Sequence, residues 1–267
     1  MADYSNNELI TAFLSRQIED DDLCFVGVGT NGRAFTLAVG IPLAAVRLAQ
    51  MNQAPGASVY WGNLLEPDLS VIPETFTQDS FTRWQAAACP PDTGVKCDML
   101  SRGSFDVSFN SAAQIDRHGN LNITAIGDYE RPRVRLVGCL AQPEHLAFVR
   151  RPLLVMDLDR RTFVEKVDFI TSVGFLDGGD ARERAGLEPG GGPRFVVTDK
   201  AIFDFTPDTR ELRLVSLHPG VSLDEVLGLM ALVPVLPDNV PETAPPTAAE
   251  LQAIRRDIDP NRILLRV

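Results

Sequence analysis

The sequence lacks the long apolar segments that mark membrane proteins and secreted precursors. No apolar run approaches the roughly 20 residues that a helix needs to span a bilayer. The opening MADYSNNEL has neither a basic region nor an apolar stretch, so no signal peptide is expected. Positive charge is also scarce, since 25 Lys and Arg face 36 Asp and Glu and the formal net charge is −11. Neither a nucleic acid nor an anionic membrane is therefore an expected partner.

Cysteine and histidine are scarce as well. The chain has four cysteines, none at a spacing typical of a zinc site: Cys24, Cys89, Cys97 and Cys139. We expect reduced thiols in a cytoplasmic protein and no metal. The three histidines form no recognisable arrangement with Ser and Asp or with Cys, and no glycine-flanked nucleophile elbow is present. His118 and His218 are expected to be exposed or structural.

Capping boxes mark three helix starts, at Ser5–Glu8, Ser222–Glu225 and Thr247–Glu250. The first predicts a helix that ends near Asp20, and a further helix is predicted from Pro42. Short apolar or β-branched runs between the helices predict strands at 23–28, 58–61, 105–110, 153–158, 167–173, 195–198 and 212–217. Strands interleaved with helices predict an α/β fold with a largely parallel sheet flanked by helices.

The same pattern predicts one domain over residues 1–267. Gly178–Pro193, rich in glycine and charge, is expected to be a surface excursion. Pro234–Pro246, with five prolines, is expected to be an extended linker over the domain. A C-terminal helix at about 247–258 follows it.

Three local features are candidates for binding. Gly27–Gly32 follows a strand and could cradle a phosphate on backbone N–H groups, but Gln50 and Gln53 occupy the region where a dinucleotide site needs an acid. Gln114–Asn122 gathers amides and carboxylates around a glycine turn, where they bind either a ligand or their own backbone. Arg131–Arg135 is a basic island that is either a solvated face or an attractor of phosphates.

The stretch SAAQIDRHGNLNITAIGDYERPRVRLVG (Ser111–Gly138) resembles the B subunit of glutaconate CoA-transferase. The opening residues, Arg160–Gly178, Phe195–Phe205 and Ala248–Pro260 are similar too, in the same order along the chain. Leu214–Ser222 resembles the related subunit of steroid ring-cleaving CoA hydrolases.

The resemblance implies an α/β fold of the CoA-transferase type and an A-type subunit as partner, with the active site at the interface. It implies an acyl-CoA thioester as substrate, coenzyme A entering only as part of that substrate, and no metal. In the transferases a glutamate of the B-type chain attacks the thioester and forms an acyl anhydride and then a glutamyl-CoA, which splits one hard step into two.

This sequence departs from the family where that glutamate belongs, at the end of an early strand. Anchoring on Gly62 puts Tyr60 in its place, and a shift of one residue puts Trp61 there. Neither can form an acyl anhydride, and a phenol with a pKa of about 10 is protonated at neutral pH. Glu66 lies on the same loop, six residues beyond Tyr60, and is the alternative nucleophile.

This sequence also departs from the family at a glycine-rich loop. Only the first glycine of that loop, Gly138, is present, and Cys139, Leu140 and Ala141 follow it. The candidate catalytic residues are therefore Tyr60 and Glu66. The candidate substrate-binding residues are Trp61, Gly62, Asn63, Gln114, Asn120, Gly138, Cys139 and Leu140.

Three functions remain open. The first is half of an acyl-CoA hydrolase or lyase that opens a ring or removes a carboxylate. Under it, Tyr60 donates a hydrogen bond to a developing oxyanion and Trp61 lines a pocket for a cyclic or branched acyl group. The second is a true CoA-transferase that uses Glu66 or a residue of the A-type subunit. The third is a non-catalytic scaffold that shapes the CoA pocket.

Overall fold

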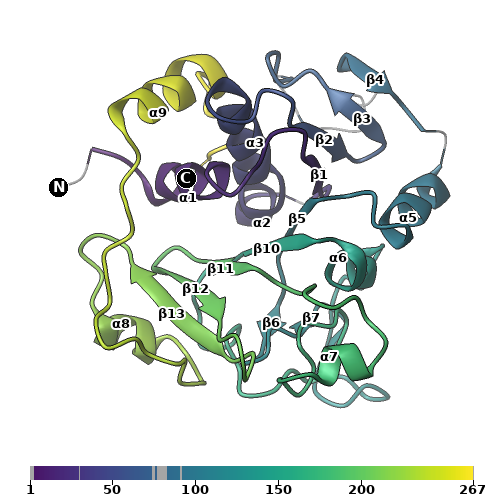
Figure 1. Ribbon diagram of the computed structural model, residues 1–267, viewed down its shortest axis with the longest axis vertical. Coiled ribbons are helices and arrows are strands. Elements are labelled where there is room, and N and C mark those ends of the chain that lie inside the picture. The colour runs from purple at the N-terminus through teal and green to yellow at the C-terminus, as the bar shows by residue number, and fades with distance from the viewer. Residues whose placement is uncertain (1–2, 30, 74–75, 77–82, 91, 267) are drawn as a thin grey trace. The chain divides into compact units, whose positions relative to one another are not determined.

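The computed structural model describes residues 3–29, 31–73, 76, 83–90 and 92–266 (Figure 1). The chain forms two compact units. Unit 1 comprises Met1–Met99, Ser104–Phe109 and Ala244–Val267, and unit 2 comprises Leu100–Gly103 and Asn110–Thr243. One domain over residues 1–267 stays a prediction.

The strands of unit 1 lie in the order β5-β1-β2-β3-β4. They are β1 (Leu23–Val26), β2 (Ser58–Trp61), β3 (Leu64–Pro67), β4 (Ala86–Ala88) and β5 (Val107–Asn110), whose last residue belongs to unit 2. β1 pairs in parallel with β2 and β5, whereas β2–β3 and β3–β4 are antiparallel. β1, β2 and β5 are continuous buried runs, as expected for parallel strands covered on both faces.

The helices of unit 1 are α1 (Asn6–Ser15), α2 (Arg33–Phe35), the π-helical turn η1 (Thr36–Gly40), α3 (Ile41–Met51), α5 (Thr93–Ser101, whose last two residues belong to unit 2), α9 (Ala248–Ala253) and the π-helical turn η2 (Ile254–Ile258). α3 packs against β1, β2 and α1. Arg33–Met51 is apolar and long enough to cross a membrane, but 72% of its most apolar window is buried, as in a core helix.

One of the two predicted helix boundaries in unit 1 was wrong. The first helix ends at Ser15 rather than near Asp20, because the amide of Gln53 donates to the carbonyls of Ser15 and Ile18 and stabilises a tighter turn. The helix predicted from Pro42 is confirmed as α3, which begins one residue earlier, at Ile41, and continues the helical turns of α2 and η1.

Unit 2 contains the strands β10 (Arg151–Val155), β11 (Phe195–Val197), β12 (Ala201–Phe205) and β13 (Leu212–Leu217), in the order β13-β12-β11-β10. β10 and β11 are parallel, and the other two pairs are antiparallel. β13 alternates buried and half-buried residues, the pattern of an antiparallel strand with one wetter face. Figure 1 shows β11, β12 and β13 side by side as green arrows.

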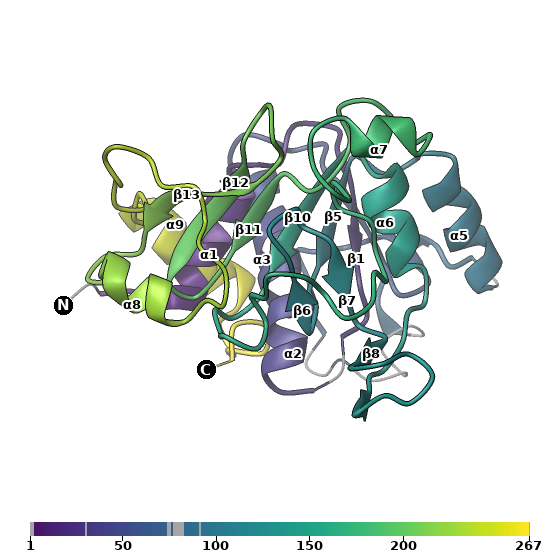
Figure 2. The ribbon, with the colours of Figure 1, turned by 90° about the horizontal axis from the view of Figure 1, so that it is seen from below.

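Two small hairpins and three short helices complete unit 2. The hairpins are β6 (Gln114–Ile115) with β7 (Leu121–Asn122), and β8 (Ala125–Ile126) with β9 (Val134–Arg135), which lies at the bottom of Figure 2. The helices are α6 (Gln142–Phe148), α7 (Ala181–Arg184) and α8 (Leu223–Gly228).

The predicted α/β fold with a largely parallel sheet flanked by helices is confirmed, with antiparallel hairpins added to the parallel strands of each unit. The strand predicted at Val167–Val173 is wrong. Its polar groups bond singly to the first small hairpin instead of forming a ladder, as Asp168 N does to Gln114 Oε1 and Thr171 N to Leu121 O.

The capping predictions hold at both ends of the chain. Ser5–Glu8 and Thr247–Glu250 form complete capping boxes, and the C-terminal helix occupies residues 248–258. Ser222 caps α8, but Glu225 pairs with Lys200 at 2.8 Å instead of closing the box.

Candidate active site

Tyr60 is fully buried at the end of β2. Its ring stacks on Phe25 at 5.8 Å between centroids and meets Phe105 edge-on at 5.7 Å. Its hydroxyl has no hydrogen-bond partner in the described part of the chain. Burial raises the pKa of the Tyr60 phenol, and the nearby Cys89, Asp92 and Cys97 raise it further. The group is therefore a neutral donor at physiological pH, held in an apolar wall.

Trp61, the next residue, is also buried and belongs to an aromatic cluster. Its ring lies 5.2 Å from Phe76 and 5.6 Å from Trp84. Trp84 is fixed by a 2.8 Å hydrogen bond from its Nε1 to Asp68 O. The cluster surrounds the strand end with large flat side chains.

Gly62 and Asn63 form the two-residue turn between β2 and β3. Trp61 pairs with Leu64 across it, and Gly62 has φ = 62°. A first turn residue with positive φ is what a type II′ hairpin turn requires, and only glycine adopts it without strain. The turn geometry therefore accounts for Gly62.

Glu66 lies away from the strand end at which anchoring on Gly62 predicts the transferases' glutamate. Leu65 is paired with Tyr60, so Glu66 lies further back, toward the start of β2. It is exposed, has φ = 52°, and lines a cavity of about 430 Å³ together with Arg47 and Ser58. The Glu66 carboxylate and the Tyr60 hydroxyl therefore lie in different environments, since Glu66 lines this cavity and Tyr60 is fully buried.

Gly27–Gly29 follow β1, and Gly32 precedes a helix that begins at Arg33, while Thr30 of the predicted loop lies outside the described residues. A Cβ at Gly29 would lie 2.9 Å from Val39 Cγ2, so this glycine allows close packing on the helix. Gln50 and Gln53 donate to the backbone carbonyls of Ala57, Ser15 and Ile18. The described residues of the loop thus pack closely on the helix, and both glutamines bind backbone carbonyls.

Asn120 lies in the glycine turn of unit 2 and uses its whole amide inside the chain. Its Nδ2 donates to both carboxylate oxygens of Asp116 and to Leu176 O, and its Oδ1 accepts from Gly174 N and Leu176 N. Burial raises the pKa of Asp116 against the hydrogen bonds that lower it, among them the one from His118 N. The turn is a satisfied internal network.

Gln114 is engaged in the same way. Its Oε1 accepts from Asn122 Nδ2 at 2.7 Å and from Asp168 N at 3.1 Å, and its Nε2 donates to Asp168 Oδ2 at 3.1 Å. The contacts described for the Gln114 and Asn120 side chains are all within the chain. Substrate binding by either residue stays a prediction.

The loop that begins at Gly138 is exposed. Gly138 has φ = 82° and Ala141 has φ = 64°. Leu140 is 67% exposed, Val137 is 87% exposed, and Cys139 is exposed beside them. The loop thus displays two large apolar side chains to solvent.

The remaining polar candidates, His118 and His218, make contacts within the chain. His218 is buried, with Nδ1 3.0 Å from Thr243 Oγ1 and Nε2 2.8 Å from Thr198 O. His118 Nδ1 lies 3.0 Å from Arg210 O. Among the residues that the structure describes, no three His, Cys, Asp or Glu side chains gather as metal ligands would.

The surroundings of Tyr60 could not be predicted from the sequence. Cys89, Asp92 and Cys97 lie far along the chain from it and reach it only through the fold. Buried Lys96 is on the same helix as Cys97, and burial lowers the pKa of its ammonium group. No spacing rule signals such a grouping.

The family sequence model described as Coenzyme A transferase matches residues 95–228. The B-type chain of the 3-oxoadipate CoA-transferase of Pseudomonas knackmussii is 37% identical over 262 residues, covering 96% of this chain and 94% of that protein. The chain belongs to the coenzyme A transferase family. It corresponds to the B-type subunits of that family, and the family identity confirms the resemblance noted in the sequence.

Two further B-type chains of this coenzyme A transferase group are similar. That of the glutaconate CoA-transferase of Acidaminococcus fermentans is 29% identical over 100% of this chain and 98% of its own. The cholesterol ring-cleaving hydrolase IpdB subunit of Rhodococcus jostii is 31% identical over 84% of this chain and 83% of its own. The crystal structure of the Acidaminococcus glutaconate coenzyme A-transferase superposes with a TM-score of 0.82 at 27% identity, covering 99% of this chain and 98% of that one.

Proposed function

We propose that this chain is the B-type subunit of a heteromeric enzyme that hydrolyses or cleaves an acyl-CoA substrate, by ring opening or decarboxylation, without a carboxylate nucleophile on β2. The observation that carries the proposal is the fully buried Tyr60, whose hydroxyl has no partner among the described residues. It stands where alignment on Gly62 puts the transferases' glutamate. The nearest acid on the hairpin, Glu66, lies toward the other end of β2.

Tyr60 supplies a hydrogen bond in this proposal. A buried neutral phenol donates to the thioester or enolate oxygen as negative charge develops there, and a donor already held in place needs no reorganisation. Its raised pKa keeps the proton on the phenol. In this proposal the general base comes from the A-type subunit.

The aromatic cluster determines which kind of acyl group the site accepts in this proposal. Trp61, Phe76 and Trp84 pack ring against ring, and a site walled by large flat side chains favours a cyclic or branched acyl group over a small acid. Gly62 and Asn63 form the hairpin turn next to this aromatic cluster.

The A-type partner is supported by the exposed loop of unit 2. Val137 and Leu140 present apolar side chains to solvent, with Cys139 between them, and a subunit that covers the loop would bury this surface. Gly138 gives the loop its positive φ.

True CoA transfer is the second candidate, favoured by the 37% identical relative that bears the name of a 3-oxoadipate CoA-transferase. In that case Glu66, which lines a cavity of its own, or a residue of the A-type subunit is the nucleophile. A scaffold role for this chain is the third candidate.

The test uses the chain co-purified with its A-type subunit and a panel of cyclic and linear acyl-CoA thioesters. Turnover is measured with and without an acceptor acid, and borohydride trapping is followed by mass spectrometry of this chain. Turnover without acceptor, no glutamyl-CoA adduct, and an active Glu66→Gln variant are the expected results. A covalent adduct on Glu66, or strict dependence on an acceptor acid, would falsify the hydrolase or lyase proposal.

A further inference from the structure

Unit 2 contains a cavity of about 400 Å³ lined by five arginines and one carboxylate, in a chain whose formal net charge is −11. We call it the arginine pocket. Its lining arginines are Arg150, Arg151, Arg194, Arg210 and Arg213, and the carboxylate is Asp204.

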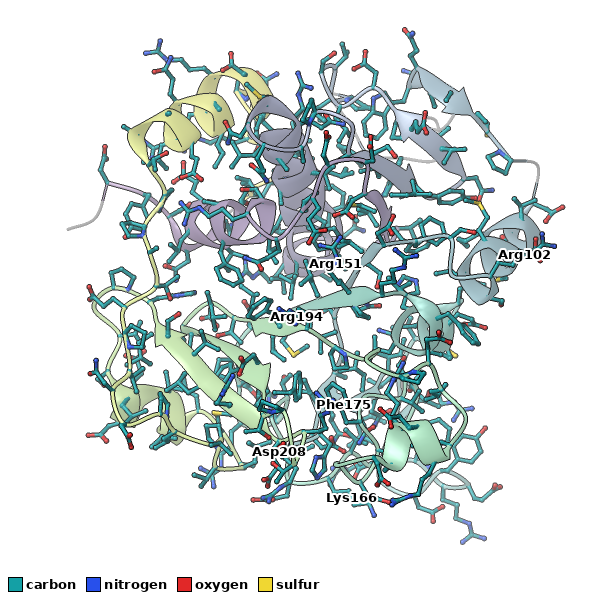
Figure 3. The ribbon with its side chains drawn as sticks, in the orientation of Figure 1. Arg102, Arg151, Lys166, Phe175, Arg194 and Asp208 are labelled. Carbon is teal, nitrogen blue, oxygen red and sulfur yellow. The ribbon has the colours of Figure 1, made fainter. Side chains whose placement is uncertain are left out.

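The parallel strands β10 and β11 account for the positions of three of these arginines. Arg151 opens β10, and Arg194 immediately precedes β11. The register pairs Leu153 with Phe195, and Arg194 N donates to Pro152 O at 2.8 Å. Since parallel strands start at the same edge of a sheet, Arg150, Arg151 and Arg194 come together there, and Figure 3 shows Arg151 and Arg194 as neighbours.

The antiparallel hairpin β12–β13 adds the other two. β12 runs back along β11, so its last residues, Asp204 and Phe205, return to the same edge. Arg213 lies across from Asp204, and its guanidinium makes two contacts with that carboxylate, at 2.8 and 2.6 Å. Arg210 is in the connecting turn.

Three of the five guanidinium groups are held in place, that of Arg213 by Asp204 and two by aromatic rings. The Arg210 guanidinium carbon lies 5.3 Å from the centroid of the Phe175 ring, and that of Arg194 lies 5.7 Å from the Phe195 ring. A guanidinium that lies against an aromatic ring or is braced by one carboxylate loses little freedom on binding and still has N–H donors for phosphate oxygens.

A glycine run forms one wall of the arginine pocket. Gly190 and Gly192 have φ of 75° and 105°, and a Cβ at Gly192 would lie 2.7 Å from the Phe175 ring. No atom lies within 4 Å of a Cβ placed at Gly190. Backbone without side chains lets an anionic group come close to peptide N–H donors.

We propose that the arginine pocket binds a ligand with two or more phosphate groups. A single phosphate would fill only part of a cavity this size, while several guanidiniums match the oxygens of a pyrophosphate bidentately. Two sources share this chemistry: the nucleotide end of a CoA thioester, or a separate free nucleotide. The inference concerns phosphate binding and does not rest on the reaction proposed above.

The experiment titrates the complex of this chain and its A-type subunit with inorganic pyrophosphate and with adenosine 3′,5′-bisphosphate by calorimetry. Arg194→Gln and Arg210→Gln are compared with the control Arg161→Gln, which removes the same charge from a side chain that is 93% exposed and outside the pocket. We expect saturable binding, a Kd at least tenfold higher in both pocket variants, and an unchanged Kd in the control. Thermal unfolding of each variant checks that it is folded.

Competition then separates the sources. If CoA displaces pyrophosphate and Arg194→Gln raises KM for acyl-CoA, the ligand is the nucleotide end of the substrate. If CoA does not compete and KM is unchanged, it is a separate nucleotide. Absence of saturable binding to the wild-type complex, or equal Kd values in pocket and control variants, overturns the proposal.

Discussion

Two turns stood out in the sequence, and the structure separates them by how their buried polar atoms are satisfied. In unit 2, the amide of Asn120 uses every donor and acceptor within the chain. In unit 1, the hydroxyl of Tyr60 is equally buried and has no partner in the described residues. A satisfied buried group holds a fold together, whereas an unsatisfied one carries a cost in stability that a ligand can relieve. The residues richest in polar chemistry thus form the scaffold, and a tyrosine in an aromatic wall forms the candidate site.

The largest expected effect is on stability at the satisfied turn. Asn120→Ala removes five hydrogen-bond contacts and takes these partners from Asp116 Oδ2 and from backbone groups of Gly174 and Leu176, so we expect a loss of about 3 kcal/mol in the free energy of unfolding. Urea unfolding of the complex measures it. The control Asn239→Ala, at an exposed position, should change it by less than about 0.5 kcal/mol. A loss below about 1 kcal/mol for Asn120→Ala would show that the network is not a scaffold.

The opposite behaviour is expected of Tyr60→Phe. The ring and its packing stay, no hydrogen bond within the described chain is lost, and the cost of a buried unpartnered hydroxyl is removed, so the free energy of unfolding should rise by about 1 kcal/mol. Loss of an oxyanion donor should lower kcat about 100-fold. Steady-state kinetics with acyl-CoA and parallel urea unfolding check both, with Tyr129→Phe as the exposed control. Unchanged kcat would remove Tyr60 from the site.

A third prediction concerns His218, a buried histidine whose two ring nitrogens both have hydrogen-bond partners. Burial lowers the pKa of His218 below its usual 6.5, so the folded state binds its proton less readily than the unfolded chain. The stability that depends on neutral His218 is fully present above pH 6.5 and is lost as the pH falls from there through the folded pKa. The slope cannot exceed about 1.4 kcal/mol per pH unit for one proton. Unfolding free energies measured between about pH 7.5 and 4.5 should lose this slope in His218→Gln, and an identical slope in the variant would contradict the assignment.

The smallest effect is expected at the exposed loop. Cys139 is exposed on the Gly138 loop, so Cys139→Ser should change kcat less than twofold. The same kinetic assay measures it. A loss of tenfold or more, matched by Cys139→Ala, would make the thiol part of the chemistry and would weaken the contrast between the two turns.

Local signals predicted the parts of the fold that depend on neighbours in sequence. Both capping boxes at the chain ends, the strands at Ser58–Trp61 and Leu212–Leu217 and the C-terminal helix follow from nearby residues. The end of the first helix was mispredicted because Gln53, distant in sequence, satisfies its last carbonyls. The strand expected at Val167–Val173 failed for a related reason, since its hydrogen bonds go singly to another hairpin.

The sequence by itself determined the family and the α/β class, because residue order and spacing carry that information, and it predicts Tyr60 at the place of the transferases' glutamate. Only the tertiary structure decided that Asn120 is satisfied, that the Tyr60 hydroxyl is buried without a partner in the described residues, and that five arginines from two strand pairs line one cavity. Burial, hydrogen-bond satisfaction and the meeting of strand ends are properties of residues that are distant along the chain. They exist only once the chain has folded.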